Sequence, residues 1–260
     1  METLLKVENL VVRFGGIIAV NSVSFDVPKG SIFAIIGPNG AGKTTIFNAI
    51  SGIYIPNEGS IYYRGELING MKPFNIAKRG IARTFQNIEL FARMTAMENI
   101  MLGRHLHMKT GLLRGAFMYG RRSLVAREEV EHRHKAEKII DLLELQSVRN
   151  HFVGDLPYGK QKLVELARAL ALEPGLLLLD EPSAGMNSEE KQDLFFWIKD
   201  IQQELNTTIL MIEHDMKMVM DISDTVLAIN FGVPIAMGDP LMVAEHPEVL
   251  KAYLGEENIA

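Results

Sequence analysis

The chain of 260 residues contains no cysteine, which excludes disulfides and thiolate metal sites. It also lacks any apolar run near the ~20 residues that a membrane-spanning helix needs. The first residues show no basic segment followed by an apolar one, the mark of a secretory signal, so we expect a cytoplasmic protein. The net charge of -5 gives no reason to expect nucleic acid as a partner. What is present is a chain of ordinary apolar content that is long enough to bury a substantial core.

The most informative stretch is a glycine-rich loop between an apolar run at 32–36 and a helical pattern at 44–51. It reads Gly37-Pro38-Asn39-Gly40-Ala41-Gly42-Lys43-Thr44-Thr45 and matches the phosphate-binding pattern G-x-x-x-x-G-K-[ST]. A strand, a glycine loop and a helix in this order point backbone N–H groups at one phosphate chain. Lys43 adds a positive charge for the β- and γ-phosphates, and the Thr44 hydroxyl is placed to ligate Mg²⁺. The stretch therefore predicts binding of a nucleoside triphosphate.

The remaining periodicity predicts an α/β fold. Residues 4–12 and 23–27 are typical of an antiparallel strand pair with one wet face. Later apolar runs alternate with helical stripes, which favours a largely parallel sheet. In one expected helix, from about 188 to 205, the buried stripe would be Leu194, Ile198, Ile201 and Leu205. Together with the phosphate loop, this predicts a P-loop NTPase core with a mostly parallel sheet and an N-terminal antiparallel β subdomain.

Polar side chains follow three of the expected strands. Asp180 and Glu181 end a run of four leucines, while Gln86 and His214 each follow another strand. Strands of one orientation deliver their last residues to the same edge of the sheet, where ligands of α/β proteins bind. Asp180 would there hold Mg²⁺, and Glu181 would polarise the water that attacks the γ-phosphate. We expect Gln86 and His214 to join this site.

Other features have a structural and a functional interpretation. Phe14, in a glycine-rich turn, is either a packing residue or a platform on which a base stacks. The pairs His105/His107 and His132/His134 suggest a metal, but residues two apart on a helix point away from each other, so the second pair could not chelate. The basic stretch 104–122 is expected to be an exposed insertion.

The order of these motifs resembles that of ATP-binding-cassette (ABC) ATPases, over nearly the whole chain. The resemblance implies one domain over residues 1–260, with an insertion plus helical subdomain at about 88–165 and a helical C-terminal tail at about 239–260. It also implies a head-to-tail dimer that sandwiches ATP. Phe14 would then stack on adenine, Gln86 would contact Mg²⁺ and the attacking water, and His214 would hold the γ-phosphate. Residues 183–187, hereafter the interface loop, would cross between the two subunits.

One segment departs from the pattern of the family. The family signature reads Leu-Ser-Gly-Gly-Gln, whereas this chain has Leu156-Pro157-Tyr158-Gly159-Lys160, hereafter the signature segment. Pro157 replaces the serine whose hydroxyl should reach the partner's γ-phosphate, and it has neither a hydroxyl nor a backbone N–H. The resemblance therefore leaves the hydrolytic competence of this half-site open.

Within the family, the chain is most similar to the larger ATPase of branched-chain amino acid importers. This similarity lies in residues 83–87, in the basic stretch and in the tail ending at 252–255. This implies an ATP-hydrolysing subunit on the inner face of the cell membrane, bound to permease subunits and to a second ATPase subunit, most simply as a heterodimer. The alternatives are an ABC ATPase that moves another solute, such as one for lipopolysaccharide export, and a soluble ABC-type ATPase without a permease. A small-molecule kinase would share the phosphate loop alone.

Overall fold

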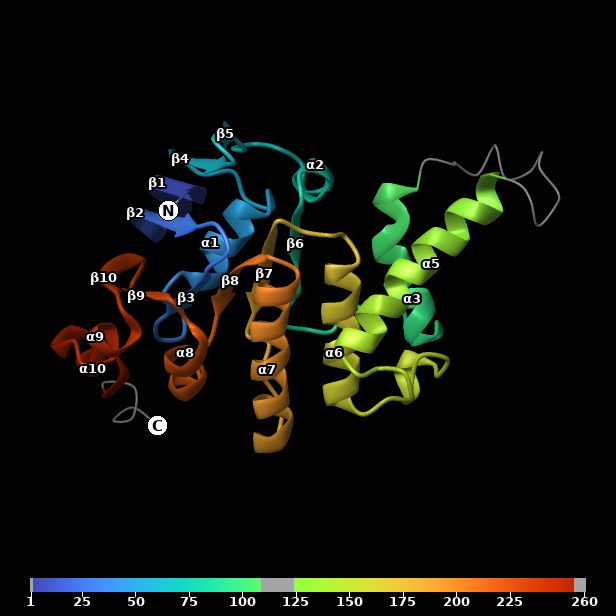
Figure 1. The fold of residues 1–260 in the computed structure, drawn as a ribbon. Helices are drawn as coiled ribbons and strands as arrows, with labels where there is room; N and C mark the ends of the chain where they lie inside the picture. The colour runs from blue at the N-terminus through green and yellow to red at the C-terminus, as the bar shows by residue number, and fades with distance from the viewer. Residues whose placement is uncertain (1, 109–123, 255–260) are drawn as a thin grey trace. The chain divides into compact units, whose positions relative to one another are not determined.

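A computed structural model describes residues 2–108 and 124–254 of the chain. The fold divides into two units, each compact (Figure 1). The first unit comprises Met1–Gln86, Gly175–Ala184 and Lys191–Ala260, and the second comprises Asn87–Pro174 and Gly185–Glu190. None of the described helices has the length and apolar character needed to cross a membrane.

The first unit carries all the named strands of the described chain. In chain order its elements are β1 (Thr3–Phe14), β2 (Ile17–Pro28), β3 (Ile32–Ile36), α1 (Lys43–Ile50), β4 (Glu58–Tyr63), β5 (Glu66–Leu67), α2 (Pro73–Lys78), β6 (Ile81–Arg83), β7 (Leu176–Asp180), most of α7 (Ser188–Glu204), β8 (Thr208–Ile212), α8 (Met216–Ile222), β9 (Thr225–Asn230), β10 (Val233–Gly238), α9 (Pro240–Ala244) and α10 (Pro247–Leu254).

These strands form two sheets. One is antiparallel with the order β2-β1-β4-β5, and the other has the order β10-β9-β3-β8-β7-β6. The second sheet is parallel except for the β9–β10 hairpin. An α/β fold with a mostly parallel sheet and an antiparallel β region, as the sequence predicts, is thereby confirmed. In the parallel register, Ile212 of β8 pairs with Ile35 on one side and with Asp180 on the other. The chain therefore leaves β3, β8 and β7 at one common edge.

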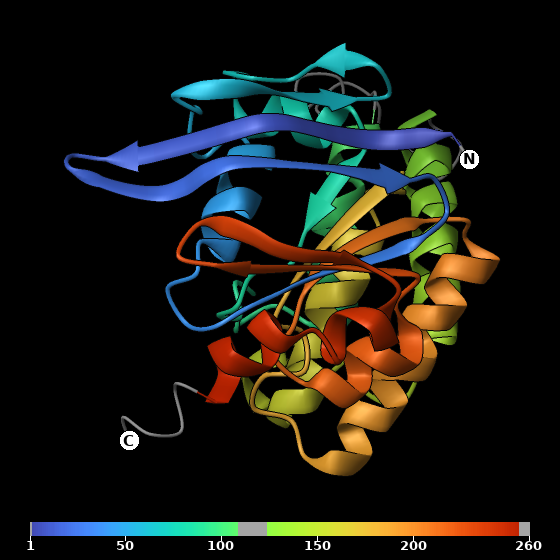
Figure 2. The same cartoon turned by 90° about the vertical axis from the view of Figure 1, so that its left-hand side faces the viewer.

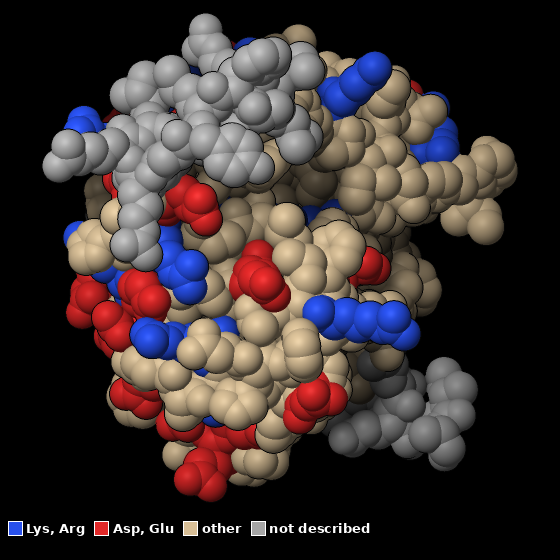
Figure 3. All heavy atoms as spheres, turned by 90° about the vertical axis from the view of Figure 1, so that its right-hand side faces the viewer, with Lys and Arg blue, Asp and Glu red and all other residues tan. Residues whose placement is uncertain are grey.

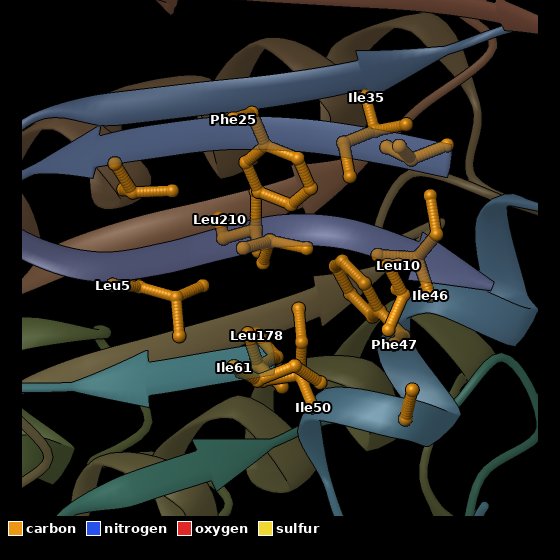
Figure 4. Packing of buried hydrophobic residues seen from close by; sticks show 14 of the residues in the cluster. Leu5, Leu10, Phe25, Ile35, Ile46, Phe47, Ile50, Ile61, Leu178 and Leu210 are labelled. Atoms are coloured by element: carbon orange, nitrogen blue, oxygen red, sulfur yellow. The ribbon is translucent and has the colours of Figure 1, made fainter. Parts of the chain in front are cut away.

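The core of the first unit lies where α1 packs between the two sheets (Figure 4). Leu5 and Phe25 come from the antiparallel sheet, Phe47 comes from α1, and Leu178 and Leu210 come from the parallel sheet. Figure 2 shows the long β1–β2 hairpin, in dark blue, extending past α1. Because α1 is enclosed by apolar groups, the loop that precedes it is held firmly in place.

The second unit is helical. Its elements are α3 (Ala96–Gly103), the 3-10 helix η1 (Arg104–His107), α5 (Leu124–Leu142), the 3-10 helix η2 (Val153–Asp155), α6 (Tyr158–Leu170) and the start of α7. Thr95 begins α3 with a capping box, because its hydroxyl accepts from the Glu98 N–H while Glu98 accepts from the Thr95 N–H.

The expectation of an exposed insertion over 104–122 is wrong at its start. Arg104 is fully buried, and its guanidinium donates to His132 Nδ1 and to the Ala171 carbonyl and pairs with Glu173. A buried guanidinium needs several acceptors, and these three supply them. Residues 109–122 of the expected insertion lie outside the described residues.

The expected helix at 188–205 is present as α7, and a capping box forms between Asn187 and Glu190. Leu194, Ile198 and Ile201 are buried as predicted. Leu205 is 47 % exposed, so the prediction that it belongs to the buried stripe is wrong. The helix ends at Glu204, so Leu205 lies just beyond its last residue.

Candidate nucleotide-binding and hydrolysis site

The predicted phosphate loop joins β3 to α1 in the first unit, and its backbone requires glycine at two places. Gly37 has φ +152° and Gly42 has φ +102°. A Cβ on Gly37 would overlap the Ile229 carbonyl oxygen, and one on Gly42 would overlap the Ala19 carbonyl oxygen. Only glycine satisfies both the backbone angle and this close approach. The loop therefore turns tightly into the N-terminus of α1, which has no acidic residue in its first turn to compete with an anion.

Lys43 stands at the first position of α1 and is buried. Its ammonium group donates to the Gly37 carbonyl at 2.6 Å and to the Pro38 carbonyl at 2.9 Å, which places the charge against the loop itself. Thr44, one residue on, is exposed. The loop thus brings a cation, a hydroxyl group and the positive end of a helix to one place, and together these favour a polyphosphate.

Phe14 ends β1 and keeps 44 % of its surface exposed. Its ring meets the edge of the Tyr54 ring, with the centroids 5.0 Å apart and the planes at 72°. Such an edge-to-face pair is a preferred aromatic geometry and restricts the orientation of both rings. Tyr54 was not among the predicted site residues, because nothing in its local sequence distinguishes it from a loop residue after α1. The pair presents an exposed aromatic platform in the same unit as the phosphate loop.

Glu181 directly follows β7, and two predicted site residues converge on its carboxylate. Gln86 Nε2 donates to Glu181 Oε2 at 3.0 Å. His214 Nε2 lies 2.6 Å from Glu181 Oε1. The backbone of Glu181 has φ +49°, a left-handed conformation that is strained for a residue with a side chain. The structure thus brings Gln86, Glu181 and His214 together from three different strand ends.

His214 is held by the residue that follows it. Asp215 begins α8, and its carboxylate accepts from the Met218 N–H at 3.2 Å and from Lys191 Nζ at 2.9 Å. Burial alone would raise the pKa of Asp215, but the hydrogen bonds from Lys191 and from the backbone outweigh it and lower the pKa. The carboxylate therefore stays charged and fixes the start of α8 beside His214.

Asp180 ends β7 as a buried carboxylate. Its Oδ2 accepts from Arg83 NH2 at 2.8 Å, and Arg83 NH1 donates in turn to Asn48 at 2.8 Å and to Ser51 at 3.2 Å. Arg83 therefore ties the expected metal ligand to the C-terminal turn of α1. Sequence reasoning missed Arg83. The signal for it was a charged residue that ends the short apolar strand β6.

The donor set expected for Mg²⁺ is a carboxylate from Asp180, an amide from Gln86 and a hydroxyl from Thr44. All three supply oxygen, the ligand atom that Mg²⁺ prefers. Within residues 2–108 and 124–254, no group of three or more His, Asp or Glu side chains is placed to hold a metal ion. The two members of the second histidine pair lie in different surroundings, since His132 is buried against Arg104 whereas His134, on the same helix, is exposed.

The signature segment belongs to the second unit. Pro157 precedes the first residue of α6 and makes no side-chain cap hydrogen bond. Gly159 is buried, and a Cβ there would overlap the Glu190 carboxylate. Gln161 Nε2 donates to the Leu156 carbonyl at 2.8 Å, and this hydrogen bond closes the turn that leads into α6. The segment thus presents a helix N-terminus, but the position that the family fills with serine has no hydroxyl.

Comparisons with known proteins agree with this geometry. A family model described as "ABC transporter" matches residues 20–184, and one described as "Branched-chain amino acid ATP-binding cassette transporter" matches residues 233–258. The chain is 44 % identical to the high-affinity branched-chain amino acid transport ATP-binding protein BraF of Pseudomonas aeruginosa, over 97 % of this chain and 98 % of that one.

Two further relatives cover the chain almost completely. It is 41 % identical to the protein of the same description, LivG, of Escherichia coli strain K12, over 98 % of this chain and 99 % of that one. The crystal structure of the ADP conformation of an ATP-binding cassette of an ABC transporter matches with a TM-score of 0.85 and 32 % identity, over 98 % of this chain and all of the other. This chain belongs to the ABC transporter family and is one of its ATP-binding cassettes, an ATPase.

Proposed function

We propose that this chain is the ATP-hydrolysing subunit that powers a membrane importer of branched-chain amino acids. The observation that carries the proposal is 44 % identity over nearly the full length to a high-affinity branched-chain amino acid transport ATP-binding protein. The match of residues 233–258 to the branched-chain model supports the same solute class. In this proposal the chain acts on the membrane through permease subunits, to which it binds at the inner face.

In this proposal the phosphate loop and α1 bind the triphosphate, and Lys43 opposes the charge of the β- and γ-phosphates. The exposed ring of Phe14 stacks on adenine. Thr44, Gln86 and Asp180 would hold Mg²⁺, which supplies charge neutralisation at the phosphates. Glu181 accepts a proton from the attacking water.

The positions of Gln86 and His214 give each a role beside Glu181. Gln86 donates to one carboxylate oxygen of Glu181 and thereby orients it. His214 lies against the other oxygen. In this proposal its ring also holds the γ-phosphate. Removal of the Glu181 charge should therefore stop hydrolysis without preventing nucleotide binding.

The test of hydrolysis uses Glu181→Gln in the complex purified through a tag on this chain. Glu204→Gln, an exposed carboxylate at the end of α7, is the matched control. We expect ATP binding to persist in Glu181→Gln while steady-state turnover falls by about a hundredfold or more, on the scale of other catalytic groups. Turnover at the parental rate would remove Glu181 from the proposed role.

The test of the solute is uptake in cells that lack this chain. Labelled leucine, isoleucine and valine should enter more slowly than in parental cells, while uptake of an acidic and a basic amino acid should be unchanged. Complementation with the parental chain restores uptake, and complementation with Glu181→Gln does not. Normal uptake of all three branched-chain amino acids would favour another solute or an ATPase that acts without a permease.

A second part of the proposal concerns the partner. We infer that the chain works as a heterodimer with a cassette whose signature is closer to the family pattern, because Pro157 removes the hydroxyl from one of the two composite sites. Loss of a hydrogen bond to a charged group costs about 1.5–3 kcal/mol, or roughly ten- to a hundredfold in rate. Glu181→Gln should then reduce transport-coupled hydrolysis far more than the same change in the partner. Equal losses, or a fully active homodimer, would contradict the heterodimer.

A further inference from the structure

Glu213 directly follows β8 and precedes His214, and its side chain is enclosed, with 2 % of the residue exposed. Its Oε1 accepts a hydrogen bond from the Ser183 backbone N–H at 2.9 Å. Its Oε2 accepts from the backbone N–H groups of His214 at 2.9 Å and Asp215 at 3.3 Å. A single buried carboxylate therefore connects the first residue of the interface loop to the start of the His214 segment. A charged acceptor makes stronger hydrogen bonds than a neutral one.

The connection bears on Glu181, which lies two residues before Ser183. The left-handed backbone of Glu181, with φ +49°, costs free energy and persists only where the surroundings hold it. On its N-terminal side, the Glu181 N–H donates to the Ile212 carbonyl at 2.9 Å. On its C-terminal side, Ala184 N–H donates to the Glu181 carbonyl at 3.1 Å, and Glu213 holds Ser183. The turn that contains Glu181 is thus fastened at both ends to the β8 segment.

We propose that Glu213 is a positioning residue for ATP hydrolysis, which fixes the turn carrying Glu181 against the segment carrying His214. The inference rests on the proposed function of Glu181. The side chains of Glu181 and His214 meet at 2.6 Å. A shift of either backbone would lengthen this distance beyond the range of a hydrogen bond. Because one carboxylate binds the N–H groups of both segments, it sets their separation directly. The interface loop begins at Ser183, so the same carboxylate also determines where that loop leaves the sheet.

The Glu213 carboxylate bonds outside the phosphate loop, so positioning can be separated from general stability by comparing kcat with nucleotide affinity. The phosphate loop is built on β3 and α1, whereas the Glu213 carboxylate bonds to residues 183, 214 and 215. Loss of the carboxylate should therefore lower kcat and leave the affinity for nucleotide nearly unchanged. A residue needed only for the fold would lower both together.

The experiment compares Glu213→Ala and Glu213→Gln with the parental chain. Alanine removes every acceptor, and we expect kcat to fall by about ten- to a hundredfold, the effect of a small misplacement of catalytic groups. Glutamine keeps one acceptor oxygen but turns an NH₂ donor toward the other N–H groups, so its kcat should lie between those of the parent and the alanine variant. Binding of a fluorescent ATP analogue to each purified chain should stay within about threefold of the parental Kd.

Two controls complete the design. Glu204→Ala, an exposed carboxylate of α7, should keep parental kcat and Kd. Glu181→Gln shows whether the proposed function holds at all, since turnover that survives this change would refute the catalytic role itself. If Glu181→Gln abolishes turnover but Glu213→Ala keeps kcat within about twofold, the positioning role of Glu213 is wrong while the proposed function stands. A proportional loss of kcat and nucleotide affinity in both Glu213 variants would also overturn it.

Discussion

The buried pair between Arg83 and Asp180 allows a quantitative test of how the hydrolysis site is supported. The two side chains are 8 % and 3 % exposed, and their atoms meet at 2.8 Å. Arg83→Met keeps most of the apolar stem but leaves the buried Asp180 without this cation. Breaking a buried pair from one side costs about 3–5 kcal/mol, because the remaining charge stays out of water.

The expected loss is large enough to measure by thermal unfolding. In domains of 150–250 residues each kcal/mol lowers Tm by about 2–4 °C, so Arg83→Met should lower it by roughly 6–20 °C. The matched control is Arg79→Met. Arg79 pairs with Glu66 at the surface, where the side chains are 38 % and 62 % exposed, and such a pair contributes at most about 1 kcal/mol.

A double variant separates charge burial from loss of packing. Arg83→Met combined with Asp180→Leu removes both charges, and apolar replacement of a whole buried pair is often neutral or stabilising. We therefore expect its Tm to lie above that of Arg83→Met alone, by circular dichroism in the same buffer. A Tm for Arg83→Met within about 2 °C of the parental value would refute the reasoning. So would a double variant whose Tm falls by the sum of the decreases in Arg83→Met and Asp180→Leu alone.

Three further outcomes are expected. Lys43→Ala should weaken nucleotide binding or turnover by about 3 kcal/mol, seen as a shift in Kd or kcat, and near-normal turnover would contradict its role. Phe14→Ala should weaken ATP binding by about 1–3 kcal/mol, while tripolyphosphate, which has no base, binds as before. An unchanged affinity for ATP would show that Phe14 is a packing residue. Burial, followed by the charge of Arg104, lowers the pKa of His132, so its contribution to the free energy of unfolding is present above the ordinary histidine pKa of about 6.5 and is lost as the pH falls below it. His132→Gln should flatten the decline in urea midpoint between about pH 7 and 5, whereas His134→Gln, an exposed control, should not.

The sequence predicts those parts of the site whose information is local. The phosphate loop is a contiguous pattern, and the strand that ends in Asp180 and Glu181 is identified by four leucines. The α/β class follows from strands that alternate with helices. These predictions needed no knowledge of which strand pairs with which.

Support from distant residues could not be predicted in the same way. Arg83 meets Asp180 because β6 pairs with β7, which lies more than ninety positions along the chain. Tyr54, in a loop, meets Phe14, at a strand end, across forty positions of the chain. Hydrophobic period fixes the type of each element, but strand order depends on the packing of the whole sheet. Without the strand order, the partner of a single charged residue at a strand end cannot be predicted.

The charged residues on one face of the molecule are of mixed sign. On the face drawn in Figure 3, Lys and Arg side chains alternate with Asp and Glu. The exposed residues of α5 follow the same mixture, with Arg127, Glu129, Glu131 and Arg133 close in sequence. Mixed charge of this kind is typical of a solvated helix face.

A regularity in the site connects the predicted residues with the missed ones. On β6, Arg83 stands three residues before Gln86, and after β8, Glu213 stands immediately before His214. Each strand end thus supplies one side chain for the expected chemistry and one that binds the neighbouring strand end. Arg83 holds Asp180, and Glu213 holds the turn after Glu181. Strand ends at a shared edge must be fixed relative to one another, because the reacting groups come from different strands. Arg83 and Glu213 are therefore best interpreted as supports for the neighbouring strand end, and their variants test that interpretation by stability and by kcat respectively.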